Sequence, residues 1–249
     1  ARLSGWRAPR SSAASRERHE AYMLLRLAII ATLGLASALR PTPTHLASTH
    51  SQPALSRRAL LPALAAAATV RPSPALAADA LEQHTTGSYQ VTFGAPAGWP
   101  VSEQELQGSR YLYIATDPAE PDSANVVLTF QPLAADYTSL GSFGTQQLVG
   151  NSLMPQCADR SGGGCTLEGY GIEGKMLGTD TLKGAYTYDY TIQQTGKAPR
   201  HLRTLFAVQT EEGRGRRLVT LTAQCYESKY AELKPMFQKV LESYSTSLK

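Results

Sequence analysis

The chain has 249 residues, 42% of them hydrophobic, and a formal net charge of +4. Residues 1–77 hold 10 arginines and two glutamates, whereas residues 78–249 hold 14 Lys+Arg and 18 Asp+Glu, a net charge of −4. The basic charge therefore belongs to the N-terminal part, and the mildly acidic remainder argues against a nucleic-acid-binding face. Three cysteines are too few for a disulfide scaffold.

The N-terminal part carries several targeting patterns in series. Residues 1–22 show no hydrophobic periodicity, and we expect them to be non-coding, because a new pattern opens at Met23. Residues 23–38 have the basic start, apolar run and small-x-small exit of a secretory signal peptide. Their apolar run is shorter than the roughly 20 residues that span a bilayer. Residues 39–55 contain no acid and many hydroxyl residues, as transit peptides do.

A second export signal is predicted at residues 56–77. Arg57 and Arg58 precede an alanine- and leucine-rich run that ends in Ala75-Leu76-Ala77. Paired arginines are typical of Tat-type signals, so we expect the mature chain to begin at Ala78 and to form a single domain, 78–249. Three addresses in tandem predict delivery to the thylakoid lumen of a chloroplast wrapped in extra membranes, a secondary plastid. Bacterial or mitochondrial export is the alternative, although neither explains tandem signals.

Residues 78–249 show mainly the alternation expected of strands. Strands are predicted for residues 88–93, 110–117, 124–133, 185–195, 201–210 and 216–225. A short helix is predicted within 142–154 and an amphipathic helix over 227–245, with Pro235 placed in its first turns. Strands joined by short turns with few helices predict an α+β fold, in which helices sandwich a central antiparallel β-sheet.

Catalytic motifs are not found in residues 78–249. His84 and His201 are the only histidines there, and GxSxG, HExxH and Walker patterns are missing. We interpret Gly162-Gly163-Gly164 as a loop tip, Glu211-Glu212 as a solvated turn, and the tyrosines of 186–190 as core or sheet surface. The prediction is a non-catalytic protein. A lumenal enzyme or small-ligand carrier is the alternative, and it would need a deep pocket with convergent polar groups.

The cysteines predict one disulfide. Cys157 and Cys165 flank a loop with three glycines, which allows the chain to fold back, and an exported protein meets an oxidising compartment. Cys225 ends a predicted strand and is expected to be a buried thiol. The alternative is that all three thiols are free.

The chain from Ser88 to Ser247 resembles the PsbP family of extrinsic lumenal subunits of photosystem II and their PsbP-like relatives. The resemblance is carried by RHLRTLFAV and RRLVTLTAQCYESKYAELKPMFQKVLESYS, including His201, Glu227 and Tyr230, and by YLYIATDPAEPDSANVVLTFQPL with DYTSLGSFGT. It implies an antiparallel sheet sandwiched by helices. It also implies a peripheral thylakoid protein that binds photosystem II lumenal subunits and supports oxygen evolution or its assembly, here expected to be a monomer.

The resemblance also implies a metal site. In the family the positions matching His201 and Glu227 are a histidine and an acid proposed to take part in metal binding, so calcium, manganese or zinc are the candidate ions. Two ligands are few, since closed zinc sites use four, and His84 could add a third only if the N-terminal tail folds back. The alternative is that His201 and Glu227 are structural. Only ADALEQHTTG precedes the first predicted strand, without the lysine-bearing arm of the plant subunit. An assembly factor, or a partner in photosystem I, therefore fits equally.

Overall fold

The structure is a computed structural model that describes residues 80–246 except 88, 156, 158–164 and 212–214. The predicted targeting segments 1–22, 23–38, 39–55 and 56–77 and the predicted start at Ala78 lie outside the described residues. The elements are β1 (Leu81–Thr85), β2 (Val91–Pro96), β3 (Val101–Leu106), β4 (Arg110–Thr116), β5 (Ala124–Pro132), the 3-10 helix η1 (Leu140–Phe143), α2 (Gln146–Leu153), α3 (Leu167–Tyr170), β6 (Ile172–Leu182), β7 (Ala185–Gln194), β8 (Arg200–Glu211), β9 (Gly215–Tyr226), α4 (Glu227–Ser243) and β10 (Ser245–Thr246).

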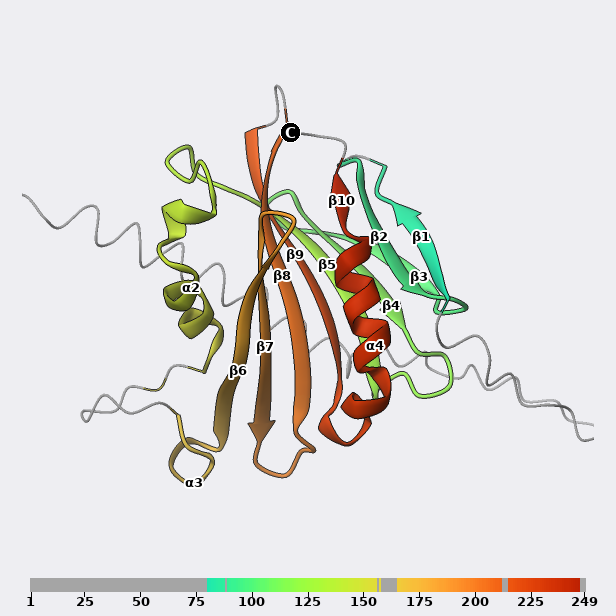
Figure 1. The fold of residues 1–249 in the computed structure, drawn as a ribbon, viewed down its shortest axis with the longest axis vertical. Coiled ribbons are helices and arrows are strands. Elements are labelled where there is room, and N and C mark those ends of the chain that lie inside the picture. The colour runs from blue at the N-terminus through green and yellow to red at the C-terminus, as the bar shows by residue number, and fades with distance from the viewer. Residues whose placement is uncertain (1–79, 88, 156, 158–164, 212–214, 247–249) are drawn as a thin grey trace, which may run out of the picture.

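Two antiparallel sheets form from these strands (Figure 1). The large sheet has the strand order β3-β4-β5-β9-β8-β7-β6, so β5 and β9 lie in its middle and β3 and β6 at its edges. The small sheet has the order β1-β2-β10. Lys183 and Gly184, which join β6 to β7, have φ angles of 51° and 80°, as a two-residue type I′ hairpin turn requires.

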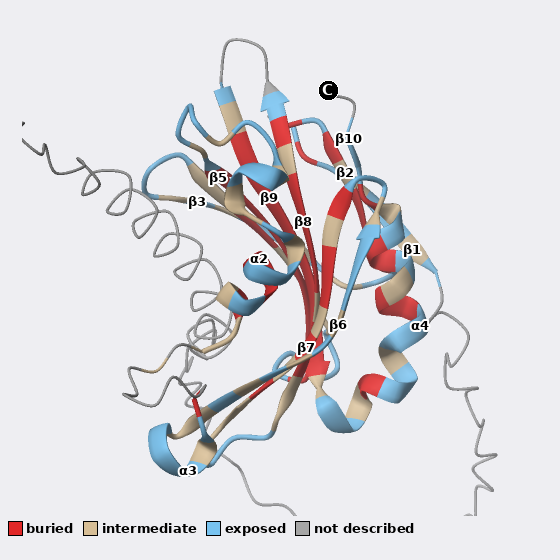
Figure 2. Ribbon diagram, turned by 60° about the vertical axis from the view of Figure 1, so that its left-hand side comes forward, coloured by how far each residue is buried: buried red, intermediate tan, exposed pale blue. Residues whose placement is uncertain are grey.

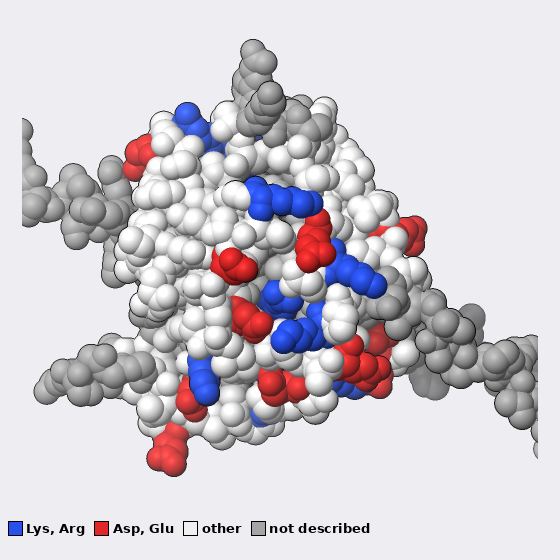
Figure 3. Space-filling view, viewed as in Figure 1, with Lys and Arg blue, Asp and Glu red and all other residues white. Residues whose placement is uncertain are grey.

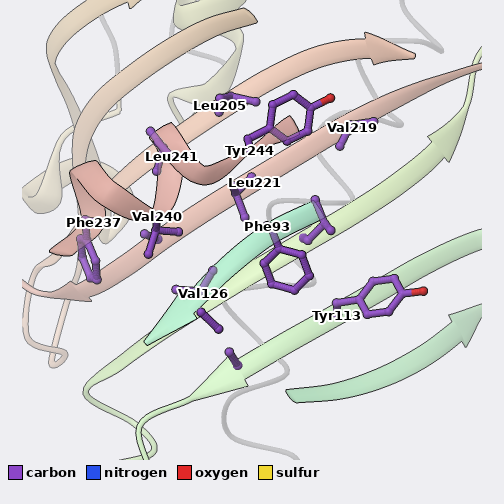
Figure 4. Packing of buried hydrophobic residues seen from close by; sticks show 14 of the residues in the cluster. Phe93, Tyr113, Val126, Leu205, Val219, Leu221, Phe237, Val240, Leu241 and Tyr244 are labelled. Carbon is purple, nitrogen blue, oxygen red and sulfur yellow. The ribbon is translucent and has the colours of Figure 1, made fainter. Parts of the chain in front are cut away.

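Helices pack on opposite faces of the large sheet (Figure 2). On one face, α4 and the small sheet bury a core that includes Phe93, Tyr113, Val126 and Phe237 (Figure 4). On the other face, α2 contributes Val149 and Leu153 to a second core over β7 and β8. This second core also contains side chains of β7, β8 and β9: Tyr188, Tyr190, Ile192, Leu202, Phe206 and Leu218. The predicted α+β class, with helices on both faces of an antiparallel sheet, is confirmed.

The tyrosines of β7 mostly belong to this second core. Tyr188 and Tyr190 are buried. The Tyr188 hydroxyl donates to the Gln146 carbonyl at 3.0 Å, and the Tyr190 hydroxyl lies 3.2 Å from Thr204 Oγ1. Satisfied hydroxyls of this kind let a tyrosine sit inside a core, which agrees with the interpretation of these residues as core.

The strongly alternating strands were predicted correctly, and four strands were missed. The missed strands are β1, β3, β6 and the two-residue β10, which lie at sheet edges and contain no buried residue. Without a continuous buried face, their hydrophobic alternation is weak. Gly174 and Gly178 weaken the signal of β6 further, because glycine is unfavourable in strand interiors.

The position of Pro235 in α4 was predicted wrongly. We placed Pro235 in the first turns, but α4 begins at Glu227, so Pro235 lies in the helix interior. A proline there cannot donate to the carbonyl four residues earlier, which belongs to Ala231. Both residues are exposed, so water can hydrogen-bond this carbonyl instead.

No helix in the described part of the chain is long and apolar enough to cross a membrane.

Candidate functional site

A buried histidine lies between two carboxylates at the junction of the large sheet and α4. His201, near the start of β8, is 2% exposed. Its Nδ1 lies 2.7 Å from Glu227 Oε2, and its Nε2 lies 2.5 Å from Asp189 Oδ1. Both ring nitrogens therefore have a carboxylate partner.

The strand register brings these residues together. His201 pairs with Thr191 on β7 and with Cys225 on β9, and Asp189 lies two residues from Thr191, on the same face of β7. Strand β9 runs directly into α4, so Glu227 is the first helical residue. The Glu227 N–H donates to the Pro199 carbonyl at 2.9 Å, which ties the start of α4 to the start of β8. His201 and Glu227 therefore lie side by side, as the sequence predicted.

Tyr230 closes the cluster from the first turn of α4. Its ring stacks on the His201 ring, with centroids 3.2 Å apart and planes inclined by 11°. Its hydroxyl donates to Asp189 Oδ2 at 2.9 Å. Arg203 Nε lies 3.8 Å from the same carboxylate. A contiguous set of contacts thus joins β7, β8 and α4.

The polar groups of the cluster complement one another. Each ring nitrogen of His201 that carries a proton can donate to the carboxylate it faces, because ionised carboxylates only accept hydrogen bonds. Burial works against ionisation of Asp189. The hydrogen bonds from His201 and Tyr230, with the charges of His201 and Arg203, outweigh that effect and lower the pKa of the Asp189 carboxyl. Burial and the bond to Asp189 raise the pKa of the Tyr230 hydroxyl.

The cluster does not match a metal centre. Asp189 and Glu227 approach opposite nitrogens of the His201 ring, so a single ion bound to one nitrogen cannot also take both carboxylates. No group of three His, Cys, Asp or Glu side chains in the described residues is arranged to hold a metal ion. His84 lies on β1 in the small sheet, where its ring packs against Phe93. The role of His201 and Glu227 as ligands for calcium, manganese or zinc stays a prediction.

The cluster also does not match an acid–base catalyst. A general base needs a nitrogen lone pair directed at substrate, whereas both nitrogens of His201 face carboxylates. Its arrangement holds the first turn of α4 against β7 and β8.

The cysteines occupy two separate places. Cys157 and Cys165 are joined by a disulfide, with their Cα atoms 5.1 Å apart. The loop tip Gly162-Gly163-Gly164 lies outside the described residues. Cys225 is a buried free thiol, and burial raises its pKa to about 12, so it is a poor nucleophile at neutral pH.

Two members of the cluster, Asp189 and Arg203, were not predicted. Asp189 is the one charged residue in the strand AYTYDYTIQQ, and a carboxylate in a strand with this many buried side chains requires a partner. Aligning β7 with β8 would have placed Asp189 opposite Arg203. The signal was present, but it required knowing which strands are neighbours.

The chain belongs to the PsbP family, whose sequence model matches residues 81–246. It is 28% identical over 168 residues to the chloroplastic PsbP domain-containing protein 3 of Arabidopsis thaliana. That match covers 68% of this chain and 65% of the relative, slightly less than two thirds of the relative's length. The resemblance inferred from the sequence is confirmed.

Solved structures show similar chain traces. Cyanobacterial PsbP (CyanoP) of Synechocystis sp. PCC 6803 matches with a TM-score of 0.47 and 21% identity, over 69% of this chain and 95% of that one. The Ran-binding protein Mog1p of Saccharomyces cerevisiae matches with a TM-score of 0.39 and 9% identity, over 67% of this chain and 95% of that one.

Proposed function

We propose that this chain is a non-catalytic extrinsic protein of the thylakoid lumen, which binds photosystem II from the lumenal side and supports oxygen evolution or its assembly. The observation that carries the proposal is the PsbP family match, which extends from β1 to β10. The predicted export signals and the chloroplastic relative support the location. Binding a membrane complex requires no helix of the chain to enter the bilayer.

The His201 cluster supports the non-catalytic part of the proposal. Both ring nitrogens of His201 and the Tyr230 hydroxyl are engaged with the Asp189 and Glu227 carboxylates, and the cluster joins α4 to the sheet. We therefore assign it a structural role, in which it fixes the orientation of α4 for a docking protein. Handling of calcium or manganese by His201 and Glu227 remains a separate proposal, tested below.

An accessory or assembly factor is the second candidate, with photosystem I as the alternative partner. It is favoured by the short segment before the first strand, because β1 begins at Leu81, three residues after the predicted start at Ala78. Residues 78–87 also contain no lysine. The lysine-bearing arm of the plant subunit therefore has no counterpart between Ala78 and β1.

Native fractionation of thylakoids distinguishes these candidates. Membranes are solubilised, separated by native electrophoresis, and probed for this protein before and after a salt wash. We expect it to migrate with photosystem II and to be released by salt, as a peripheral subunit is. Migration with assembly intermediates alone would indicate the accessory role. Migration with photosystem I would identify that complex, and not photosystem II, as the partner. A lumenal protein found only in the free fraction would contradict the proposal.

A further inference from the structure

The Cys157–Cys165 disulfide joins the end of α2 to the start of α3. Cys157 follows α2, whereas Cys165 directly precedes Thr166, the N-cap residue of α3. The α3 side of the bond is anchored, because the carbonyl of its C-cap residue Gly171 accepts from the Thr195 N–H at 2.9 Å. Thr195 directly follows β7. The bond therefore attaches the C-terminal end of α2 to a segment that is fixed to the large sheet.

Helix α2 is short and is held by a small set of contacts. It has eight residues, of which three are buried. Its first residue, Gln146, accepts from the Tyr188 hydroxyl at its carbonyl and donates from Nε2 to the Asp180 carbonyl. After the helix, Pro155 packs against β6, where a Cβ on Gly174 would lie 2.3 Å from Pro155 Cδ. Helices shorter than about 12 residues are marginal in water, so α2 depends on these contacts and on the disulfide.

Helix α2 covers aromatic side chains of the second core, on the side of the sheet opposite to α4 (Figure 2). Tyr188, Tyr190 and Phe206 are each 1% exposed there. A Cβ on Gly150 would lie 2.8 Å from Tyr188 Cε1, so the backbone of α2 rests almost directly on this ring. Exposing buried apolar side chains to water is unfavourable. The position of α2 therefore decides whether this core is covered.

The three cysteines differ in how accessible their sulfur atoms are. Cys157 is partly exposed, whereas Cys165 is 7% and Cys225 is 0% exposed. Cys225 belongs to the core on the α4 side of the sheet, where the surface carries Lys and Arg interspersed with Asp and Glu (Figure 3). Thiol–disulfide exchange requires access to a sulfur atom, so it begins at Cys157 and does not involve Cys225. The pair therefore alternates between two states, a disulfide and a dithiol.

We propose that the Cys157–Cys165 disulfide is a redox-sensitive clasp, which holds α2 on the sheet when oxidised and releases it when a dithiol reductant reduces the bond. One thiolate of the reductant attacks Cys157 Sγ and forms a mixed disulfide, while the S–S bond breaks and Cys165 leaves as a thiolate that takes up a proton. The second thiol of the reductant then displaces Cys157, which also takes up a proton. The chain gains two electrons and two protons, and the reductant becomes a disulfide.

Reduction removes the covalent attachment at the C-terminal end of α2. A closed loop restricts the chain, so opening it returns conformational freedom to the segment beside α2. Local unfolding is easiest where few apolar side chains are buried. Helix α2 buries three residues, whereas the 17-residue α4 buries five. We therefore expect reduction to open α2 while α4 stays packed, which makes the thiol poise of the compartment a control on the second core.

Reduction of the folded protein tests whether the clasp can be opened. The purified chain is treated with dithiothreitol in the absence of denaturant, alkylated, and analysed by mass spectrometry. We expect Cys157 and Cys165 to become alkylated and Cys225 to stay protected by burial. A disulfide that dithiothreitol reduces only after urea is added would overturn the inference, because such a bond opens only when the whole domain unfolds.

Hydrogen exchange tests the release of α2. On reduction, the amides of residues 149–154 should accelerate about tenfold more than those of residues 236–241 in α4, because α2 opens locally. The double variant Cys157→Ser, Cys165→Ser is the control for the reductant, and it should exchange like the reduced wild type with or without dithiothreitol. Unchanged exchange in α2 would overturn the inference. Equal acceleration in α2 and α4 would also overturn it, because the bond would then stabilise the domain only as a whole.

Discussion

Tyr230 links His201 to Asp189, because its ring stacks on His201 and its hydroxyl group hydrogen-bonds Asp189. Its ring lies flat on the imidazole, with 3.2 Å between centroids, and its hydroxyl donates to Asp189 Oδ2 at 2.9 Å. The first turn of α4 is thereby held to β7 and β8 by both an aromatic and a polar contact. The two contributions can be separated by mutation.

Tyr230→Phe should lower the free energy of unfolding by about 1–2 kcal/mol, because it leaves the Asp189 carboxylate without one donor but keeps the ring. Tyr230→Ala should cost more, about 3–5 kcal/mol, because it also creates a cavity over His201. Equilibrium denaturation in urea measures both. If both variants lost the same free energy of unfolding, the hydroxyl alone would account for the contribution of Tyr230 to stability.

Asp189→Asn should make stability less dependent on acid pH. The pKa of Asp189 is lowered in the folded state, so its ionised form stabilises the fold above the unfolded value of about 4, and this stabilisation is lost as pH falls through the lowered folded value. The wild type should therefore be more stable than Asp189→Asn at pH 7, and the difference should narrow toward pH 3. Urea denaturation across that range checks it, and a constant difference would contradict the assignment.

Metal titration distinguishes the two interpretations of His201 and Glu227. Because both ring nitrogens already face carboxylates, we expect wild type and His201→Ala to bind calcium, manganese or zinc equally in calorimetry, with His84→Ala as the matched control. Binding that His201→Ala abolishes and His84→Ala preserves would instead establish His201 as a ligand.

Removing the disulfide should destabilise the domain moderately. The double variant Cys157→Ser, Cys165→Ser should lose roughly 2–3 kcal/mol, because a short closed loop restricts the unfolded chain. Mass spectrometry of the unreduced protein should find Cys157 and Cys165 protected by their bond, and Cys225 protected by burial. Alkylation of both loop cysteines without reductant would disprove the pairing.

Pro235→Ala should stabilise the protein, unlike most substitutions. It restores a donor for the Ala231 carbonyl in the exposed interior of α4, where proline costs up to about 3 kcal/mol relative to alanine. Thermal denaturation should show a higher midpoint. Gln238→Ala, on the same helix, is the control, and it should change the midpoint little. An unchanged or lower midpoint for Pro235→Ala would show that the helix needs the proline geometry.

The sequence by itself determined the elements whose pattern is set by burial. Strands β5, β7, β8 and β9 alternate or run apolar because their side chains fill two cores, and α4 shows one apolar face for the same reason. It also indicated the PsbP resemblance and the residues His201 and Glu227. Each of these signals is local, or lies in motifs that can be read along the chain.

Only the tertiary structure determined which residues form the His201 cluster and which strands lie at the edges of the sheets. Asp189 reaches His201 because β7 and β8 are neighbours in one register, and register depends on contacts far apart in sequence. The mid-helix place of Pro235 follows from α4 beginning at Glu227, where β9 ends. Strand β6 escaped prediction because an edge strand buries little.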